Sequence, residues 1–170
     1  MTAIATLLAG GRLTAQEIQD VAPNAAVKPG DESVTDSAAL QNDNDLFLVL
    51  PATGTFAFIA ALYCQSTVAQ GSGDIKMAFT WPAGASSSWS TLGNAASSGA
   101  GVSMNAVRNT SGASLSCGVG ATEVPVVLFG TIVMGGTAGD LQLEWAQNTA
   151  AASQSITVKA QSWLIAWQIA

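Results

Sequence analysis

Residues that could do acid–base chemistry are scarce in the β-rich part of this chain. Beyond residue 46 the carboxylates are Asp74, Glu123, Asp140 and Glu144, and the sequence of 170 residues contains no histidine. The absence of histidine excludes Ser-His-Asp and Cys-His catalysis as well as proton transfer by imidazole. A glycosidase needs two carboxylates that converge on one cleft. The sequence leaves a Glu123–Glu144 pair open without favouring it, so we predict that the protein is not an enzyme.

Metal and cofactor motifs are equally weak. The run Asn42-Asp-Asn-Asp45 offers oxygen ligands, but it lacks the glycine and the distal glutamate of a calcium loop. It is more typical of a turn that leads into a strand at Leu46. Gly71 and Gly73 lack the later glycine and the helix start of a phosphate-binding loop. We therefore predict no metal and no cofactor.

The two cysteines, Cys64 and Cys117, have no neighbouring cation or histidine that would lower a thiol pKa. We expect two reduced thiols, mostly buried. A disulfide between them remains the alternative for an exported protein.

Charge and length exclude two classes of partner. The formal net charge is −6, and the few Lys and Arg residues are scattered along the chain. Nucleic acids and anionic lipids require clustered cations. The apolar run Val124–Met134 is shorter than the roughly 20 residues that a membrane-spanning helix needs. We expect neither a nucleic acid nor a membrane as partner.

Residues 1–45 differ in character from the rest of the chain and carry most of its acids. Thr14-Ala-Gln-Glu17 has capping-box spacing, which predicts one or two short helices that end before Pro23. Residues 24–45 follow Pro23, contain Pro29 and Gly30 and carry many acids, which is typical of an extended connector. We predict that residues 1–45 form an N-terminal arm and connector. The apolar residues by which this arm would anchor to a partner are Ile4, Leu7, Leu8, Leu13, Ile18 and Val21.

From residue 46 to residue 170 the pattern is that of β-structure. Apolar and polar side chains alternate over residues 75–81, 141–146 and 156–159, as in strands with one face in a core and one in water. Clusters of Gly and Ser separate these segments. About nine or ten strands at this spacing predict an all-β domain, an antiparallel β-sandwich of the jelly-roll type.

Three segments, residues 56–63, 126–134 and 163–169, are apolar on both faces. A strand of this kind must be covered on both sides, whereas a two-layer sandwich covers only the inner face. A second copy of the same chain is the economical cover, because most soluble oligomers are homo-oligomers. The alternative is a monomer that exposes a few aliphatic side chains. The residues predicted for the subunit interface are Phe58, Ile59, Val127, Phe129, Trp163, Ile165 and Trp167.

Several runs of the chain resemble small virion proteins of phages and prophages of actinobacteria. These runs are residues 28–45, 74–84 and 141–148, together with the closing Ser162-Trp-Leu-Ile. The resemblance implies a jelly-roll domain similar to trimeric head decoration proteins, head fibres or tail-tip knobs.

On this resemblance we expect a phage capsid decoration protein. It would bind the major capsid protein on the head surface as a non-catalytic homotrimer, after assembly in the host cytoplasm. The acids of the arm would meet a basic groove of the capsid. The alternative is a tail or fibre receptor-binding knob that recognises host glycan through exposed aromatic residues such as Trp89 and Tyr63.

Overall fold

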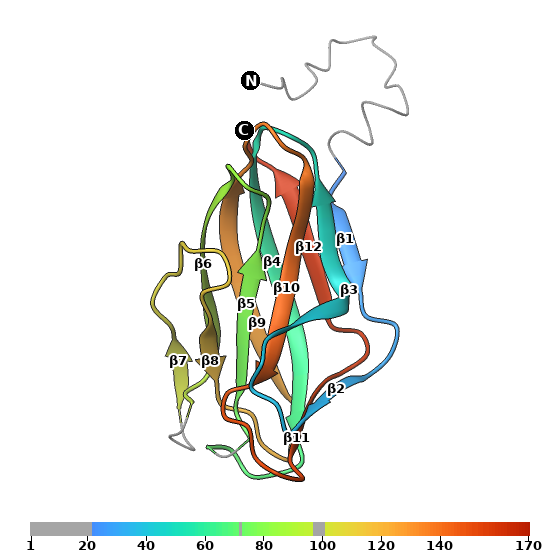
Figure 1. Ribbon diagram of the computed structural model, residues 1–170, viewed down its shortest axis with the longest axis vertical. Coiled ribbons are helices and arrows are strands. Elements are labelled where there is room, and N and C mark those ends of the chain that lie inside the picture. Colours follow the sequence, from blue (N-terminus) through green and yellow to red (C-terminus); the bar gives the residue numbers. More distant parts are fainter. Residues whose placement is uncertain (1–21, 72, 97–100) are drawn as a thin grey trace, which may run out of the picture.

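A computed structural model describes residues 22–71, 73–96 and 101–170 (Figure 1). Over these residues the protein is all-β, with twelve strands in two antiparallel sheets that face each other as a sandwich. The described ranges contain no helix of the length and hydropathy required to cross a bilayer. The short helices and the apolar anchors predicted for the arm fall within residues 1–21, outside the described residues.

The larger sheet has eight strands, in the order β1-β12-β4-β9-β6-β7, and β11 joins it by pairing with β4 and with β2. Its strands are β1 (Asn24–Val27), β2 (Glu32–Thr35), β4 (Thr55–Ser66), β6 (Ser86–Asn94), β7 (Val102–Met104), β9 (Val124–Val133), β11 (Ser155–Val158) and β12 (Trp163–Gln168). The smaller sheet has four strands, in the order β3-β10-β5-β8. Its strands are β3 (Gln41–Leu50), β5 (Ile75–Thr80), β8 (Leu115–Cys117) and β10 (Gly139–Gln147).

Strand pairing in the sandwich is nested. The strand β3 pairs with β10, β4 with β9, β5 with β8, and β6 with β7, all antiparallel. The pairs alternate between the two sheets, so the chain from β3 to β10 folds back on itself like one long hairpin wound across both layers.

The core lies between the sheets. Phe79 of β5 makes edge-to-face contacts with Phe58 of β4 and with Trp89 of β6, at ring-centroid distances of 5.1 and 5.2 Å. The segments in which apolar and polar residues alternate are indeed strands: β5, β10 and β11. Their apolar positions, such as Ile75 and Leu143, are fully buried here. The all-β sandwich predicted from the sequence is therefore confirmed.

Residues 24–45, which we predicted as a connector, instead form β1, β2 and the start of β3. The strand β1 pairs with β12 and β2 pairs with β11, both far along the chain. These strands of four residues are held by partners more than a hundred residues away, so local sequence gives little sign of them. The sandwich thus begins at Asn24 rather than near residue 46.

The described chain enters and leaves the sandwich at the same end. Ala22 and Gln168 both line a cleft there, and Thr55 N donates to the carbonyl of Ala170 at 2.7 Å. The turn between β3 and β4 lies at this end too, with Gly54 at a φ of 95° that residues with side chains rarely adopt. The loop of residues 148–154, between β10 and β11, lies at the opposite end (Figure 1).

Candidate functional site

The outer face of the larger sheet is apolar. Strand register aligns Ala25, Ile165, Ile59 and Phe129 in one row from β1 across β12 and β4 to β9. Residues directly opposite each other in antiparallel strands present their side chains on the same face, so these four form a continuous strip.

A second apolar row lies beside the first. It runs through Val27, Trp163, Ala61, Val127 and Leu92, from β1 to β6, and continues to β7. Neither row contains an acidic or basic residue. We call these two rows together the apolar band. Exposed apolar patches of this kind mark interaction surfaces.

Uncharged polar residues border the apolar band. On one side Ser33 and Thr157 share a hydrogen bond of 2.7 Å between their hydroxyls, next to Gln65. On the other side Thr131 of β9 pairs with Ser88 of β6. An apolar centre with a polar rim is the ordinary anatomy of a protein–protein interface.

Most residues predicted for the subunit interface lie on this outer face. Ile59, Val127, Phe129, Trp163 and Ile165 are half-buried and belong to the apolar band. Each shields its neighbours, which lowers the exposed fraction of every side chain.

The two remaining interface residues lie elsewhere. Trp167 sits at the margin of the same face and is 39% exposed. Phe58 lies on the opposite face of β4, inside the sandwich, and is only 2% exposed because it packs on Phe79. Phe58 is therefore a core residue and is not accessible to a second subunit.

The outer face of the smaller sheet is mixed and largely polar. Its rows pair Gln142 with Thr80 and Lys76 with Ser116, and Glu144 lies on the same face. Exposed apolar side chains occur only towards β3 among the described strands of this sheet, at Phe47 and Val49. This face offers no continuous apolar row.

The candidate carboxylates do not form a pair. Glu144 lies on the smaller sheet, whereas Glu123 directly precedes β9 of the larger sheet. Asp74 is buried at the start of β5, where its Oδ1 accepts a hydrogen bond from the backbone N–H of Gly71 at 3.0 Å. Through this hydrogen bond Asp74 stabilises the turn, as expected for an aspartate after a glycine turn. Asp140 is exposed at the start of β10.

A buried charge cluster, which the sequence analysis missed, lies between the two sheets. Lys28 follows β1, and its Nζ contacts Glu32, Asp43 at 2.9 Å and Asp45 at 3.0 Å. The side chains of Lys28 and Asp43 are 0% exposed, and those of Glu32 and Asp45 are 15% and 32% exposed. We call these four residues the Lys28 cluster. Its only sequence signal is one lysine amid a run of acids.

Asp43 is held by further donors. Its Oδ1 accepts hydrogen bonds from the backbone N–H of Asp45 at 3.0 Å and of Leu46 at 2.8 Å. Its Oδ2 accepts from Nε1 of Trp145 at 2.9 Å. The run Asn42–Asp45, which we expected to be a turn, thus belongs to β3 and turns Asp43 inward.

The lysine ammonium takes the place that a cation would occupy among these acids. One oxygen from each of Glu32, Asp43 and Asp45 lies within 4.8 Å of the others. Burial by itself lowers the pKa of Lys28, but its hydrogen bonds to the three carboxyls outweigh burial and raise the pKa above its usual value. The ammonium is therefore the resting form of Lys28.

Both cysteines are free and buried. Burial raises the pKa of Cys64 and that of Cys117, since a thiolate is poorly solvated there. Cys117 also lies 3.5 Å from the hydroxyl of Thr91. This environment matches the expectation of reduced, unreactive thiols.

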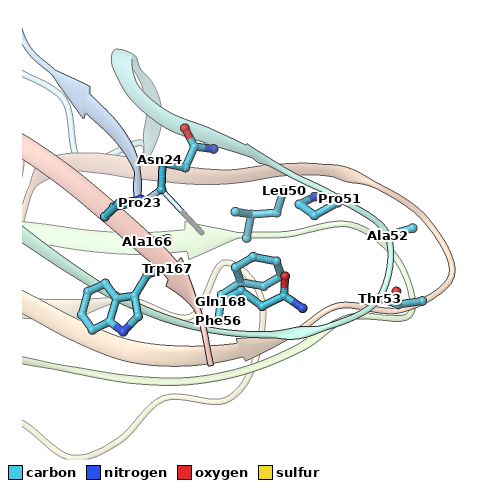
Figure 2. Close-up of a pocket in the computed structure, with 11 residues that line it drawn as sticks. Pro23, Asn24, Leu50, Pro51, Ala52, Thr53, Phe56, Ala166, Trp167 and Gln168 are labelled. Atoms are coloured by element: carbon cyan, nitrogen blue, oxygen red, sulfur yellow. The ribbon is translucent and has the colours of Figure 1, made fainter. Parts of the chain in front are cut away.

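A cleft of about 530 Å³ opens at the end of the sandwich where the described chain begins and ends. Figure 2 shows Leu50, Pro51 and Phe56 from the β3–β4 region, and Trp167 and Gln168 from β12, gathered around it. Its lining contains no acidic, basic or thiol side chain. The cleft therefore provides apolar and hydrogen-bonding contacts, but no group for acid–base chemistry.

The prediction that Trp89 is exposed is wrong. Trp89 is 1% exposed and lies on the inner face of β6, where its ring meets that of Phe79 at 90°. The serines around it suggest a surface strand, but Ser87 also faces inward and donates to the carbonyl of Thr131 at 2.9 Å. Hydrogen bonding makes such serines compatible with burial. Tyr63 is half-buried on the outer face of β4.

Comparison with known proteins places the chain in no established family. No protein-family model and no curated protein matches it. A chain from the structure of infectious bursal disease virus Gt strain is similar over 88% of this chain and 38% of its own length, with 9% identity and a TM-score of 0.26. A chain from the structure of the Gx strain of that virus is similar over 88% of this chain and 37% of its own length, with 10% identity and a TM-score of 0.23. The protein spans less than two fifths of these viral chains, and similarity at this level assigns it no function.

Proposed function

We propose that this chain is a non-catalytic structural protein of a phage virion, which assembles with copies of itself through the apolar band. In its most specific form the proposal is a decoration protein on the head surface. The observation that carries the self-assembly is the continuous apolar outer face of the larger sheet. The phage assignment is supported by the sequence resemblance of residues 28–45, 74–84 and 141–148.

A second copy fits the apolar band by its chemistry. Burying apolar surface stabilises by about 25 cal/mol per Å². Interface centres are depleted in charge and enriched in aromatic residues. The rows through Phe129 and Trp163 have this composition, and on this proposal they pack against the apolar band of another copy. The polar outer face of the smaller sheet then stays in water.

The two ends of the apolar band differ in composition. Trp163 and Trp167 lie towards β12, whereas Leu92 and Met104 lie towards β7. Contact between the β12 end of one copy and the β7 end of another can build a two-fold dimer, or a ring where the rotation between copies closes. The number three comes from the resemblance to trimeric decoration proteins.

The jelly-roll assignment is supported by the nested pairing of β3 with β10, β4 with β9, β5 with β8 and β6 with β7. Eight strands in two sheets are the jelly-roll pattern. On this proposal β1, β2, β11 and β12 extend one of its sheets.

The proposed partner beyond the chain itself is the major capsid protein, reached by the apolar anchors of the arm on the virion surface. Binding at many symmetric sites multiplies modest contacts through avidity. The location on the head, with assembly in the host cytoplasm, is likewise part of this proposal.

Two measurements on the full chain test the proposal. Sedimentation across a range of protein concentrations should give the mass of a trimer, and a monomer at all concentrations would overturn the self-assembly. Binding to purified phage heads should then be compared between the full chain and a variant that lacks residues 1–21. That deletion stops before β1, which pairs with β12 and must be kept. Unchanged head binding by the shortened trimer would overturn the role of the arm.

The alternative, a receptor-binding knob, has lost one of the two exposed aromatics it was expected to use, because Trp89 is buried. Clear glycan binding without head binding would nevertheless overturn the head assignment in favour of the knob.

A further inference from the structure

The Lys28 cluster holds a primary amine against a carboxyl group in the interior of the protein. Nζ of Lys28 lies 2.9 Å from Oδ1 of Asp43, and both side chains are 0% exposed. Glu32, which is 15% exposed, contacts the same Nζ. We propose that Lys28 and Asp43 join in an intramolecular isopeptide bond, with Glu32 as the proton carrier.

The reaction is a condensation that needs no co-reactant. A bond forms between Nζ of Lys28 and Cγ of Asp43, and one C–O bond of the carboxyl breaks. Two protons leave the lysine nitrogen and end on the departing oxygen, which is released as water. Ammonium and carboxylate thus become one neutral amide N–H and one water, so atoms and charges balance.

The surroundings of Asp43 suit the tetrahedral intermediate of this reaction. Backbone N–H groups of Asp45 and Leu46 donate to Oδ1, and Trp145 Nε1 donates to Oδ2. Fixed donors around an oxygen that gains negative charge lower the barrier of acyl transfer. Holding the two reacting groups together in a buried site replaces a bimolecular encounter and can itself supply much of the rate.

Glu32 is suited to move the protons. It contacts the ammonium directly, and its Oε1 accepts a hydrogen bond from Nδ2 of Asn44 at 3.0 Å. Because the ammonium is the resting form of Lys28, nucleophilic attack requires that a neighbour first take a proton. Transfer of one proton from Lys28 to Glu32 leaves a neutral amine, whose lone pair can attack the carboxyl carbon of Asp43.

Asp43 is the favoured acceptor among the three carboxyls of the cluster. It is fully buried and fixed by donors on both oxygens, whereas the side chain of Asp45 is 32% exposed. A bond at Asp43 would link the residue that follows β1, in the larger sheet, to β3 in the smaller sheet. It would close a covalent loop over residues 29–42.

The intact mass of the denatured, reduced full-length chain tests the proposal. The bond predicts a mass lower than the sequence mass by one water molecule. Cleavage of the chain after Glu32 places Lys28 and Asp43 in different peptides. If the bond is present, these two peptides remain joined, and fragmentation in the mass spectrometer should locate the link at Lys28 and Asp43. The full sequence mass would overturn the bond and leave an ion-pair cluster, and a link to Asp45 would overturn the choice of Asp43.

A matched pair of variants tests the proton carrier. Glu32→Gln keeps the size of the side chain and one acceptor oxygen but cannot take a proton, so the bond should form about a hundredfold more slowly after refolding. Asp45→Asn changes another carboxyl that contacts Lys28 and should form the bond within about twofold of the natural rate, since general acid–base help comes from Glu32. Equal rates in Glu32→Gln and the natural chain would overturn the role of Glu32.

Discussion

The two sheets of this sandwich have similar inner faces and very different outer faces. On the inner side both are packed with fully buried apolar residues, such as Leu62 of β4 and Leu143 of β10. On the outer side β4 presents Ala57, Ile59 and Ala61, whereas β10 presents Gln142 and Glu144. Inner faces of this kind are what any two-layer sandwich requires. The difference between the outer faces is therefore where the function of this protein should be sought.

The largest effect should follow a charge placed in the apolar band. Phe129→Lys should raise the dissociation constant of the oligomer about thirtyfold, or about 2 kcal/mol, because aromatic anchors near an interface centre dominate binding. Sedimentation equilibrium measures this constant.

The matched control is Val49→Lys, an exposed apolar residue on β3 of the smaller sheet. It should leave the dissociation constant unchanged. If both variants raise the dissociation constant equally, the oligomer does not form specifically through the outer face of the larger sheet.

A smaller effect is expected at the margin of the same face. Trp167, at 39% exposed, lies beside the apolar band, and interface rims contribute less than centres. Trp167→Ala should weaken the oligomer by about tenfold or less, or about 1.4 kcal/mol. The same sedimentation assay measures both dissociation constants. If Trp167→Ala raises the dissociation constant more than Phe129→Lys does, the centre of the interface lies at β12 instead.

The edge of the larger sheet carries a modest pH dependence. Asp31 accepts from Lys159 and from the backbone N–H of Ala160, at 2.8 Å for the latter, and these bonds lower the pKa of Asp31. A lowered carboxyl pKa stabilises the fold above the unfolded value of 3.8, and this contribution is lost as the pH falls through the folded pKa. Asp31→Asn should therefore lower the melting temperature slightly at pH 7, with the gap to the natural chain closing in strong acid. A gap that is constant with pH would show that the carboxylate charge contributes nothing.

The smallest effect is expected on the smaller sheet. Glu144→Gln should change the free energy of unfolding by less than about 0.5 kcal/mol, as is usual for surface substitutions. Urea denaturation measures this value. Any hydrolytic activity of the natural chain on glycans that disappeared in this variant would contradict the non-catalytic proposal.

The parts of the fold that could be predicted from the sequence are the strands with a regular pattern of apolar residues. Alternation identified β5, β10 and β11, and the segments apolar on both sides identified the strands whose outer residues form the apolar band. The sequence pattern could not tell the inner face of β4 from its outer face, and so misplaced Phe58, because the side chains on both faces of this strand are apolar. Only the opposite sheet, through Phe79, decides which set is inside.

Features that depend on distant partners were missed. The strands β1 and β2 have only four residues each, and their identity as strands comes from β12 and β11. The Lys28 cluster lies within residues 28–45, but its members come from the residue after β1, from β2 and from β3, so it forms only when the two sheets pack together. Trp89 was misplaced because two nearby serines, Ser87 and Ser90, are buried and hydrogen-bonded, which composition does not reveal.

The entry and exit of the described chain at one end of the sandwich make the opposite end available for engineering. Ala22 lines the cleft, and Ala170 bonds to Thr55 beside it, so both ends of the described chain lie at that end of the sandwich. Residues 148–154 turn between β10 and β11 at the far end, which makes that loop the natural place to insert a reporter peptide or an antigen for display (Figure 1).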